Sequence, residues 1–381
     1  MTDRPIRLGM VGGGEGAFIG AVHRIAARLD GHFDLCAGAL SSTPERARAS
    51  GDALRLPPDR IYDDFAAMAE AEAKRGDGIE AVAVVTPNHM HAAPAIGFLE
   101  RGIDVICDKP LTATPEDAHR LAEAARASDA LFVLTHNYTG YPMVRQARAM
   151  VAEGRIGRVR VVQVEYPQDW LATKLEAQGL KQAEWRTDPA RAGAGGATGD
   201  IGTHAFNLAA FVTGLRATAL CADLDSFVDG RPLDDNAHVL LRYEGGAKGA
   251  LWASQVAHGN ENALRLRVYG ETGGLDWAQE TPNALRHAPH AEPPRLITRA
   301  GPGVGPEAAR LTRIPAGHPE GYLEGFANIY AEAAAAIRAR RAGRPIPEEV
   351  VFPTIEDGLA GMAFVAACVR SSKAGGAWTD L

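Results

Sequence analysis

Short apolar segments alternate with amphipathic segments through the first third of the chain. The apolar segments have a strand-like pattern, and the segments between them carry apolar residues at helical spacing. Strands separated by helices indicate βαβ units, whose parallel sheet is covered on both faces. The predicted strands are Ile6–Val11, Phe33–Leu40, Ile79–Val85, Ile103–Cys107 and Ala130–Leu134, and the predicted helices are Ala17–Leu29, Pro44–Ala53, Ala92–Arg101 and Pro115–Ser128.

The pattern changes after Tyr141, where a predicted helix, Pro142–Glu153, leads into consecutive strands without long helices between them. Such a run favours an antiparallel or mixed sheet. A segment rich in Pro, Gly and Ala, Pro282–Pro306, is predicted to be an irregular loop. The other predicted strands are Val159–Tyr166, Ala217–Phe227, Asn236–Tyr243, Gly249–Val256 and Leu264–Tyr269, and two helices follow at Tyr322–Arg341 and Thr354–Ser372. We therefore predict an α/β domain over residues 1–140 and an α+β domain over 141–381.

Composition narrows the class of protein. The 381 residues are 46% hydrophobic and 23% charged with a formal charge of −7, which suits two globular domains and gives no basic stripe for nucleic acid. Arg338, Arg340 and Arg341 close a predicted helix, where the dipole favours cations, and we interpret them as structural.

The four cysteines are scattered, so we predict free buried thiols and no metal site. Without a signal peptide or an apolar run long enough to cross a bilayer, the sequence predicts a cytoplasmic protein with no membrane partner.

A glycine-rich loop, Gly12-Gly13-Gly14-Glu15-Gly16, stands between the first predicted strand and its helix. Glycines there allow close approach of a pyrophosphate to the amides of the helix start. A plain tight turn is the simpler alternative, but the strand before and the helix after favour dinucleotide binding. The third glycine of the motif is replaced by Ala17 or, in a longer loop, provided by Gly20. The predicted cofactor contacts here are Gly12, Gly14, Ala17, Phe18 and Ile19.

The end of the second predicted strand is where a carboxylate selects NAD by binding the ribose. This chain has Leu40-Ser41-Ser42-Thr43 there, with Arg46 just beyond. Ser41 and Ser42 are predicted to contact the ribose, and Arg46 offers a cation for the 2′-phosphate of NADP. These residues leave both NAD and NADP open.

Two further strand ends carry unusual polar residues, and ligands of open α/β sheets lie at such ends. Thr86, Asn88 and His91 follow one strand and are predicted to line the nicotinamide ribose, although Asn88 or His91 capping the next helix is about as good an explanation. Asp108-Lys109-Pro110 ends the next strand. Proline restricts Lys109 to extended backbone and allows a cis peptide bond, either of which fixes the direction of the ammonium group. A solvated surface lysine is the alternative.

A glycine-rich stretch, Gly193–Gly199, precedes Asp200 and His204. If Asp200 opens a helix, His204 lies one turn later on the same face. A carboxylate and an imidazole so placed suit acid–base work near neutral pH. An N-cap aspartate followed by an ordinary helical histidine is the alternative.

These motifs together resemble the Gfo/Idh/MocA family of glucose–fructose oxidoreductases and inositol dehydrogenases. Over nearly the whole length, the glycine loop, Thr86-Pro87-Asn88 with His91, Asp108-Lys109-Pro110 and Trp185-Arg186 followed by Asp200 and His204 occur in the family's order. The family more often has Glu than Asp before the lysine. The resemblance implies a Rossmann domain, then a substrate domain with an open, largely antiparallel sheet that commonly builds dimers or tetramers; a homotetramer is expected here.

The resemblance also implies roles for the site residues. His204 would take the hydroxyl proton, Lys109 would stabilise charge on the reacting oxygen, and Asp200 would hold a neighbouring hydroxyl and support the imidazolium. The predicted substrate contacts are Lys109, Tyr138, Tyr141, Asp169, Trp170, Arg186, Asp200 and His204. For the aromatic residues, Asp169 and Arg186, packing at the domain junction is an equal alternative. Asp108, Lys109 and Asn137 are expected to contact the cofactor.

The long glycine loop and Thr135-His136-Asn137-Tyr138 are similar to a subgroup that includes scyllo-inositol and L-glucose dehydrogenases, which use NAD. The likeness favours NAD over NADP in this chain. The leading hypothesis is an NAD(P)-dependent enzyme that moves hydride between nicotinamide and one hydroxyl of a cyclic polyol or sugar. Two alternatives stay open: an enzyme that retains NAD and cleaves glycosides, and a non-catalytic sugar or dinucleotide sensor.

Overall fold

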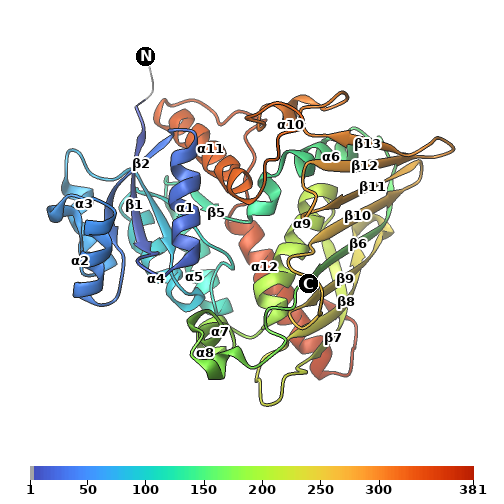
Figure 1. The fold of residues 1–381 in the computed structure, drawn as a ribbon, viewed down its shortest axis with the longest axis horizontal. Coiled ribbons are helices and arrows are strands. Elements are labelled where there is room, and N and C mark those ends of the chain that lie inside the picture. The colour runs from blue at the N-terminus through green and yellow to red at the C-terminus, as the bar shows by residue number, and fades with distance from the viewer. Residues whose placement is uncertain (1–3) are drawn as a thin grey trace. The chain divides into compact units, whose positions relative to one another are not determined.

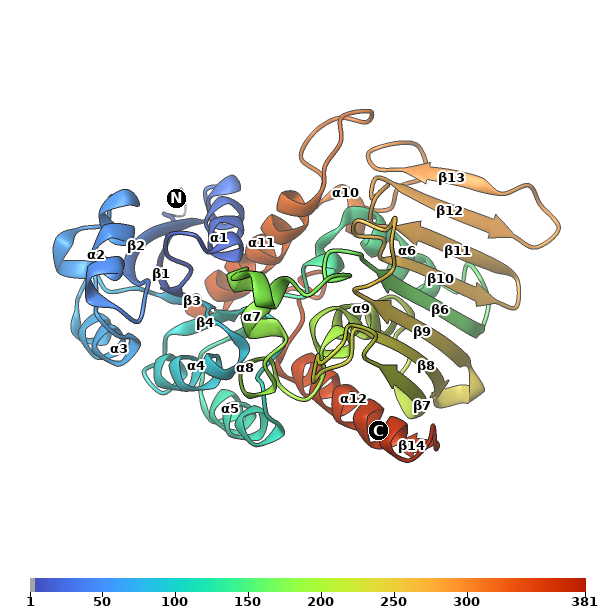
Figure 2. The same cartoon turned by 60° about the horizontal axis from the view of Figure 1, so that its bottom comes forward.

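The computed structural model describes residues 4–381, which form two compact units (Figures 1 and 2). The first unit contains the chain up to Asn137 together with Tyr322–Leu359, and the second contains Tyr138–Gly321 with Ala360–Leu381. The predicted boundary at residue 140 lies close to Asn137. The segment Tyr322–Leu359 differs from the predicted division, because it returns to the first unit instead of staying with residues 141–321.

The first unit is built on a five-stranded sheet in the order β2-β1-β3-β4-β5, and every pair in it is parallel. The strands are β1 (Ile6–Gly12), β2 (Phe33–Ala39), β3 (Ala81–Val85), β4 (Asp104–Cys107) and β5 (Phe132–Leu134). The helices are α1 (Phe18–Leu29), α2 (Pro44–Ala53), α3 (Phe65–Lys74), α4 (Ala92–Leu99), α5 (Pro115–Ala127) and α11 (Tyr322–Arg341). The predicted parallel α/β architecture of the Rossmann type is confirmed. Because all the strands run one way, their carboxyl ends share one edge of the sheet, where ligands of such folds bind.

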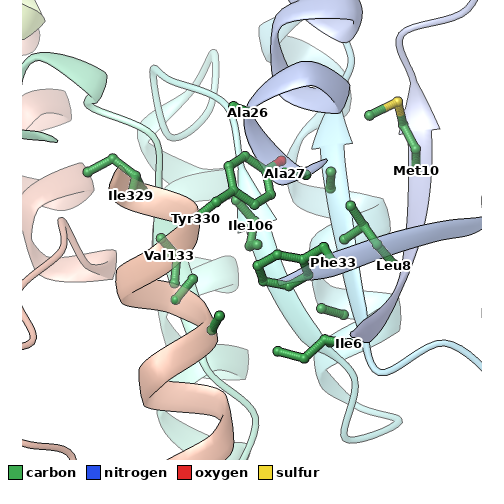
Figure 3. Packing of buried hydrophobic residues seen from close by; sticks show 14 of the residues in the cluster. Ile6, Leu8, Met10, Ala26, Ala27, Phe33, Ile106, Val133, Ile329 and Tyr330 are labelled. Carbon is green, nitrogen blue, oxygen red and sulfur yellow. The ribbon is translucent and has the colours of Figure 1, made fainter. Parts of the chain in front are cut away.

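Helix α11 explains why a late segment belongs to the first unit. It lies beside α1, and its residues Phe326, Tyr330, Ala333, Ala334 and Ile337 recur at helical spacing and are buried (Figure 1). Figure 3 shows Tyr330 of this helix beside Ala26, Ala27 and Phe33. Buried residues of β1, β3 and β4 complete the same cluster. Burying this apolar face is worth about 1.5–3 kcal/mol for each large side chain, which the helix would lose if it left the sheet.

The arginines that close α11 are structural, as the sequence suggested. Nη2 of Arg340 lies 2.6 and 2.8 Å from the two carboxylate oxygens of Asp104, at the start of β4. Arg341 binds Glu80, just before β3, and Glu80 also binds Arg4 at 2.6 Å. These ion pairs hold the end of α11 at the amino ends of the strands, at the edge of the sheet opposite the expected ligand site.

The second unit is built on a nine-stranded sheet in the order β13-β12-β11-β10-β6-β9-β8-β7-β14 (Figure 2). Every pair is antiparallel except β6 with β9, so the predicted sheet type is confirmed. Its strands are β6 (Val159–Pro167), β7 (Ala217–Asp225), β8 (Asn236–Tyr243), β9 (Lys248–Ser254), β10 (Arg265–Gly270), β11 (Gly273–Ala278), β12 (Ala284–Pro289), β13 (Arg295–Thr298) and β14 (Thr379–Asp380). Its helices are α6 (Pro142–Ala152), α7 (Lys181–Arg186), α8 (Pro189–Ala192), α9 (Thr203–Thr213), α10 (Pro306–Ala309) and the part of α12 (Ile355–Lys373) from Ala360 onward.

The prediction of an irregular loop over Pro282–Pro306 is wrong, because that segment contains β12 and β13. Leu285 and His287 point to the buried side of β12, while Arg286 between them is exposed, so the strand period of two is present. Strand β12 is short and is flanked by prolines, which are tolerated at strand ends and at sheet edges. The high Pro and Gly content hid this short alternation.

Within residues 4–381, no helix is long and apolar enough to cross a membrane. The four cysteines are free thiols, but only Cys107 and Cys368 are buried. Cys36 and Cys221 are half-buried, which corrects the prediction that all four are buried.

Candidate active site

The glycine loop connects the end of β1 to the start of α1 in the first unit. Gly12, Gly13 and Gly16 have φ values of +77°, +70° and +79°, which favour glycine because other residues are strained there. A Cβ on Gly12 would lie 2.9 Å from the Val85 carbonyl oxygen, and one on Gly14 would lie 2.6 Å from that of Leu40. The loop is therefore a cradle of bare backbone that side chains would fill.

Gly20 provides the close packing expected of the motif's third glycine. A Cβ on Gly20 would lie 2.4 Å from the Cα of Gly13, whereas Ala17 stands at the N-cap of α1. This geometry supports the longer form of the loop, with Gly20 in the place that the shorter form gives to Ala17.

The start of α1 presents its amides without a side-chain cap among the described residues, so a phosphate would satisfy them. The α1 residues predicted to contact the cofactor are placed at this start, with Phe18 exposed and Ile19 half-buried. Arg24, which the sequence analysis did not single out, supports the loop by donating to the Gly13 carbonyl at 2.5 Å. The loop and the uncapped helix start fit the pyrophosphate of a dinucleotide.

The end of β2 offers hydroxyl groups where many dinucleotide sites have a carboxylate. Ser41 Oγ lies 3.2 Å from Thr43 Oγ1 and accepts from the Thr43 amide at 3.3 Å, which fixes the turn before α2. Ser42 and Arg46 are exposed. Hydroxyls suit a ribose and a guanidinium suits a 2′-phosphate, so this turn fits either cofactor.

The ends of β3 and β4 are tied together by the imidazole of His91. Its Nδ1 lies 2.8 Å from the Pro110 carbonyl oxygen, and its Nε2 lies 2.8 Å from that of Thr86. The ring is buried and does not cap α4, so capping does not explain it. Asn88 is also buried and begins a short 3₁₀ turn, Asn88–Met90. The predicted contacts of these residues with a ribose stay predictions.

Asp108 has a dense set of partners at the end of β4. Its Oδ1 accepts from the Lys109 amide at 2.9 Å and from the Thr135 hydroxyl at 3.1 Å. His23 Nε2 lies 3.9 Å from the same oxygen, and His23 Nδ1 lies 2.8 Å from the Tyr330 hydroxyl. Burial alone raises the pKa of Asp108, but His23, together with Lys109 and His91, lowers it to about 2. The carboxyl group is thus ionised at neutral pH.

Lys109 is half-buried, and its peptide bond to Pro110 is cis, one of the two restraints that the sequence suggested. Thr135, His136 and Asn137 follow the neighbouring strand β5 and are buried. Burial and the positive charge of Lys109 lower the pKa of His136 to about 3. The imidazole of His136 is therefore neutral, which limits electrostatic repulsion beside the lysine.

Asp200 and His204 belong to the second unit. Asp200 does not open an α-helix as the sequence suggested; it lies in a π-helical turn, Thr198–Gly202, that runs into α9. Such turns recur at functional sites. Half-buried Asp234 shapes this turn, since its carboxylate accepts from the Gly196 amide at 2.7 Å and from the Thr198 amide at 2.8 Å.

The Asp200 carboxylate is oriented by two donors. Arg186 Nε lies 3.2 Å from Oδ2, and Gln255 Nε2 donates to the same oxygen at 2.9 Å. The Arg186 guanidinium also lies over two indole rings, 4.2 Å from the Trp185 centroid and 5.8 Å from that of Trp170. Gln255 is buried and was missed by the sequence analysis, since a lone glutamine after a strand gives no signal.

The imidazole of His204 is buried among aromatic rings. The Tyr138 ring lies edge-on at 4.9 Å, and the Tyr166 ring lies at 6.3 Å. The hydroxyls of Tyr138 and Tyr166 are hydrogen-bonded, and the Tyr166 hydroxyl donates to Asn262 Oδ1 at 2.7 Å. Tyr166 and Asn262 were not predicted. Their signal exists only in three dimensions, where strand β6 brings Tyr166 beside α9.

The predicted substrate wall divides into two groups. Tyr141 is fully buried and packs between Tyr138, at 5.9 Å, and Trp277, at 5.5 Å, which supports packing as its role. Trp170 and Asp169 are half-buried. Trp170 donates to Gln168 Oε1 at 3.0 Å, and Asp169 accepts from the Gly259 amide at 3.0 Å. Because the Arg186 guanidinium lies over the Trp170 ring and pairs with Asp200, these three side chains form one cluster in the second unit.

Comparisons with known proteins agree with both units. Residues 6–137 match the oxidoreductase family with an NAD-binding Rossmann fold, and residues 144–276 match the GFO/IDH/MocA C-terminal domain. An uncharacterised oxidoreductase of Bacillus subtilis (strain 168), YfiI, is 36% identical over 100% of this chain and 98% of its own length.

Two solved structures are similar throughout. An oxidoreductase from Sinorhizobium meliloti is 60% identical, with a TM-score of 0.90 over 99% of this chain and 100% of that chain. An inositol dehydrogenase homologue from Azotobacter vinelandii, in complex with NAD⁺, is 39% identical, with a TM-score of 0.96 over 99% of this chain and 98% of that chain. An inositol dehydrogenase homologue from Azotobacter vinelandii has also been solved in complex with NADH and myo-inositol. The chain belongs to the Gfo/Idh/MocA family of NAD-binding oxidoreductases.

Proposed function

We propose that the protein is an NAD(P)-dependent dehydrogenase that oxidises one hydroxyl of a cyclic polyol or sugar. The main support for this proposal is the position of the Asp200 carboxylate. Two donors hold it in the turn that leads directly to buried His204. A carboxylate and an imidazole placed four residues apart are suited to hold a substrate hydroxyl and to take a proton. The Azotobacter homologue solved with NADH and myo-inositol supports a polyol as the substrate class.

The proposed roles follow from the chemistry of each group. His204 takes the proton of the reacting hydroxyl, because imidazole titrates near neutral pH. Lys109 donates a hydrogen bond to the same oxygen and stabilises the negative charge that develops on it. Asp200 accepts from a neighbouring hydroxyl and supports the imidazolium that forms on His204. When bound, the nicotinamide supplies the acceptor for the hydride of that carbon.

The cofactor is proposed to be held by the cradle at the glycine loop, by the amides that start α1 and by the hydroxyls at the end of β2. NAD is proposed over NADP because the sequence is similar to the NAD-dependent subgroup. The exposed guanidinium of Arg46 is the feature on which NADP binding would depend. Replacing Arg46 with Ala should change the affinity for NADP much more than the affinity for NAD.

The rival functions are distinguished by the behaviour of the cofactor. A freely exchanging dehydrogenase should lose NAD on dialysis and should reduce added NAD in the presence of a substrate. A cofactor that survives dialysis, with no net reduction of added NAD, would instead favour the glycoside-cleaving alternative. Binding of sugar and dinucleotide without turnover would favour the sensor.

A homotetramer and a cytoplasmic location also stay predictions. Light scattering tests the first, and cell fractionation tests the second.

A further inference from the structure

Two buried histidines lie on either side of Lys109 in the chain, His23 behind the Asp108 carboxylate and His91 against the Pro110 carbonyl. On the amino side, Asp108 accepts the Lys109 amide, and His23 of α1 lies behind that carboxylate with Nε2 3.9 Å from Oδ1. On the carboxyl side, His91 Nδ1 lies 2.8 Å from the Pro110 carbonyl oxygen. The rings of His23 and His91 are 0% and 1% exposed, so water does not compete for these contacts.

The amino-side contact extends to the late helix α11. Tyr330 of that helix places its hydroxyl 2.8 Å from His23 Nδ1 (Figure 3 shows the Tyr330 ring in its packing). At 3.9 Å, the approach of Nε2 to Asp108 is too long for a direct hydrogen bond and acts as an electrostatic attraction. That attraction favours the hydrogen on Nε2, which leaves Nδ1 to accept from the Tyr330 hydroxyl. Four segments of the first unit, carrying Tyr330, His23, Asp108 and Thr135, thus converge behind the lysine.

The carboxyl-side contact joins two loops. His91 Nε2 lies 2.8 Å from the Thr86 carbonyl oxygen, so one ring spans the end of β3 and the segment after β4. Buried imidazoles such as those of His23 and His91 cost stability unless they are fully hydrogen-bonded. Apolar side chains would fill the same space at a lower cost in stability. Placement of Lys109 between them would explain why His23 and His91 occupy these buried positions.

We propose that His23 and His91 are positioning residues that fix the backbone of Lys109, His23 by orienting Asp108 and His91 by holding the Pro110 carbonyl. The inference rests on the proposed role of Lys109 in catalysis. Neither histidine is proposed to touch the reacting atoms. A lysine displaced by about 1 Å can cost on the order of a hundredfold in rate, so such supports affect turnover more than binding.

The test uses paired substitutions of His91 that keep one contact each. An asparagine amide reaches about as far as Nδ1 of the histidine it replaces, and a glutamine amide reaches about as far as Nε2. His91→Asn therefore places an amide donor opposite the Pro110 carbonyl, whereas His91→Gln places one opposite the Thr86 carbonyl. We expect His91→Gln to lower kcat on the order of tenfold and His91→Asn to lower it much less, with any change in the KM for NAD smaller than the change in kcat.

Tyr330→Phe gives an independent arm, because it removes only the hydroxyl that faces His23. It should lower kcat in the same direction as His91→Gln and should raise the deuterium isotope effect on hydride transfer, because chemistry becomes slower relative to release steps. These kinetics are measured with myo-inositol and NAD, or with whichever polyol the wild type turns over. Thermal unfolding of each variant is measured alongside.

Amide hydrogen exchange tests the inference without any substrate. The peptide that contains Lys109 should exchange faster in His91→Gln and Tyr330→Phe than in His91→Asn at matched global stability. Equal exchange in all three, or kcat losses that are equal for the two His91 variants and follow only their unfolding temperatures, would overturn the positioning role. A wild type that turns over no polyol would contradict the proposed function instead, and the exchange result would still decide this inference.

Discussion

The Arg186 guanidinium and the Asp200 carboxylate form an ion pair, with Nε 3.2 Å from Oδ2, while the guanidinium lies 4.2 Å from the centre of the Trp185 ring. Both side chains are mostly buried, so solvent screens the pair less than it screens a surface ion pair. The stacked plane and the directed Nε–H make this contact specific to arginine, since a lysine ammonium can reproduce neither.

Arg186→Lys should therefore lower kcat/KM for the polyol on the order of tenfold to a hundredfold, because Asp200 loses a fixed charge-assisted donor. Steady-state kinetics check this, and the dissociation constant for NAD should stay unchanged. Arg216→Lys is the matched control, because Arg216 pairs with Glu244 on an exposed part of the same unit and such pairs contribute little. Equal losses in the two variants would contradict the role given to Arg186.

Lys109→Ala and His204→Ala should each lower kcat by orders of magnitude, while the fold and the affinity for NAD stay largely intact. If both groups act on one oxygen, the double variant should lose much less than the product of the two single losses. Lys248→Ala and His258→Ala serve as exposed controls and should retain normal turnover. Near-normal turnover in either single variant would rule out the proposed mechanism.

Gly20→Ala should weaken NAD binding and lower the unfolding temperature, because its Cβ would lie 2.4 Å from the Cα of Gly13, closer than real contacts allow. Calorimetric titration and thermal unfolding measure the two effects. Gly97→Ala, in α4, is the control: its Cβ would meet nothing within 4 Å, and it should be neutral or stabilising by about 0.5–1 kcal/mol. Normal NAD affinity in Gly20→Ala would show that the loop tolerates displacement.

Stability should decline as the pH falls below about 6.5, because the pKa of His136 is lowered to about 3 in the folded state. Between about pH 3 and pH 6.5 the unfolded chain binds a proton on His136 and the folded chain does not, so protonation favours unfolding. Above about pH 6.5 the contribution of neutral His136 to stability is fully present. Urea midpoints at pH 7 and pH 5 should differ less in His136→Gln than in the wild type. Some slope should remain, because burial also lowers the pKa of His91.

Glu80→Gln separates this effect from ordinary acid unfolding. Burial alone raises the pKa of Glu80, but Arg4, the Arg7 amide and Arg341 lower it to about 2. Its stabilising contribution is thus present above about pH 4.5 and is lost only as the pH falls toward 2. Glu80→Gln should leave the difference between pH 7 and pH 5 unchanged, and a change there would assign that difference to carboxylates instead of His136.

The sequence predicted those parts of the fold whose signal is local. Strand β3 is a continuous apolar run, and α11 repeats buried residues at helical spacing, so both were found within two residues of their bounds. Strand β12 was missed because two buried residues, Leu285 and His287, are too few to outweigh the surrounding prolines. The return of α11 to the first unit was also missed, since its partner α1 lies about three hundred residues earlier in the chain.

The candidate site divides in the same way. Motif residues such as Lys109, Asp200 and His204 stand out because reactive groups follow strand ends or glycine-rich turns. Their supports do not stand out: Gln255 and Tyr330 look like ordinary strand-end and helix residues, and only the folded chain shows that they contact Asp200 and His23. The π-helical turn at Asp200 was likewise not readable, because it depends on Asp234, which binds the turn from a distant loop.

The central claim is tested most directly by following the absorbance of reduced nicotinamide when purified protein is given NAD or, separately, NADP with a panel of inositols and hexoses. We expect reduction of NAD with a stereochemically related subset of these compounds, much less reduction of NADP, and loss of the activity in His204→Ala. If neither NAD nor NADP is reduced with any compound of the panel, in protein shown to bind NAD, the assignment as a polyol or sugar dehydrogenase is contradicted.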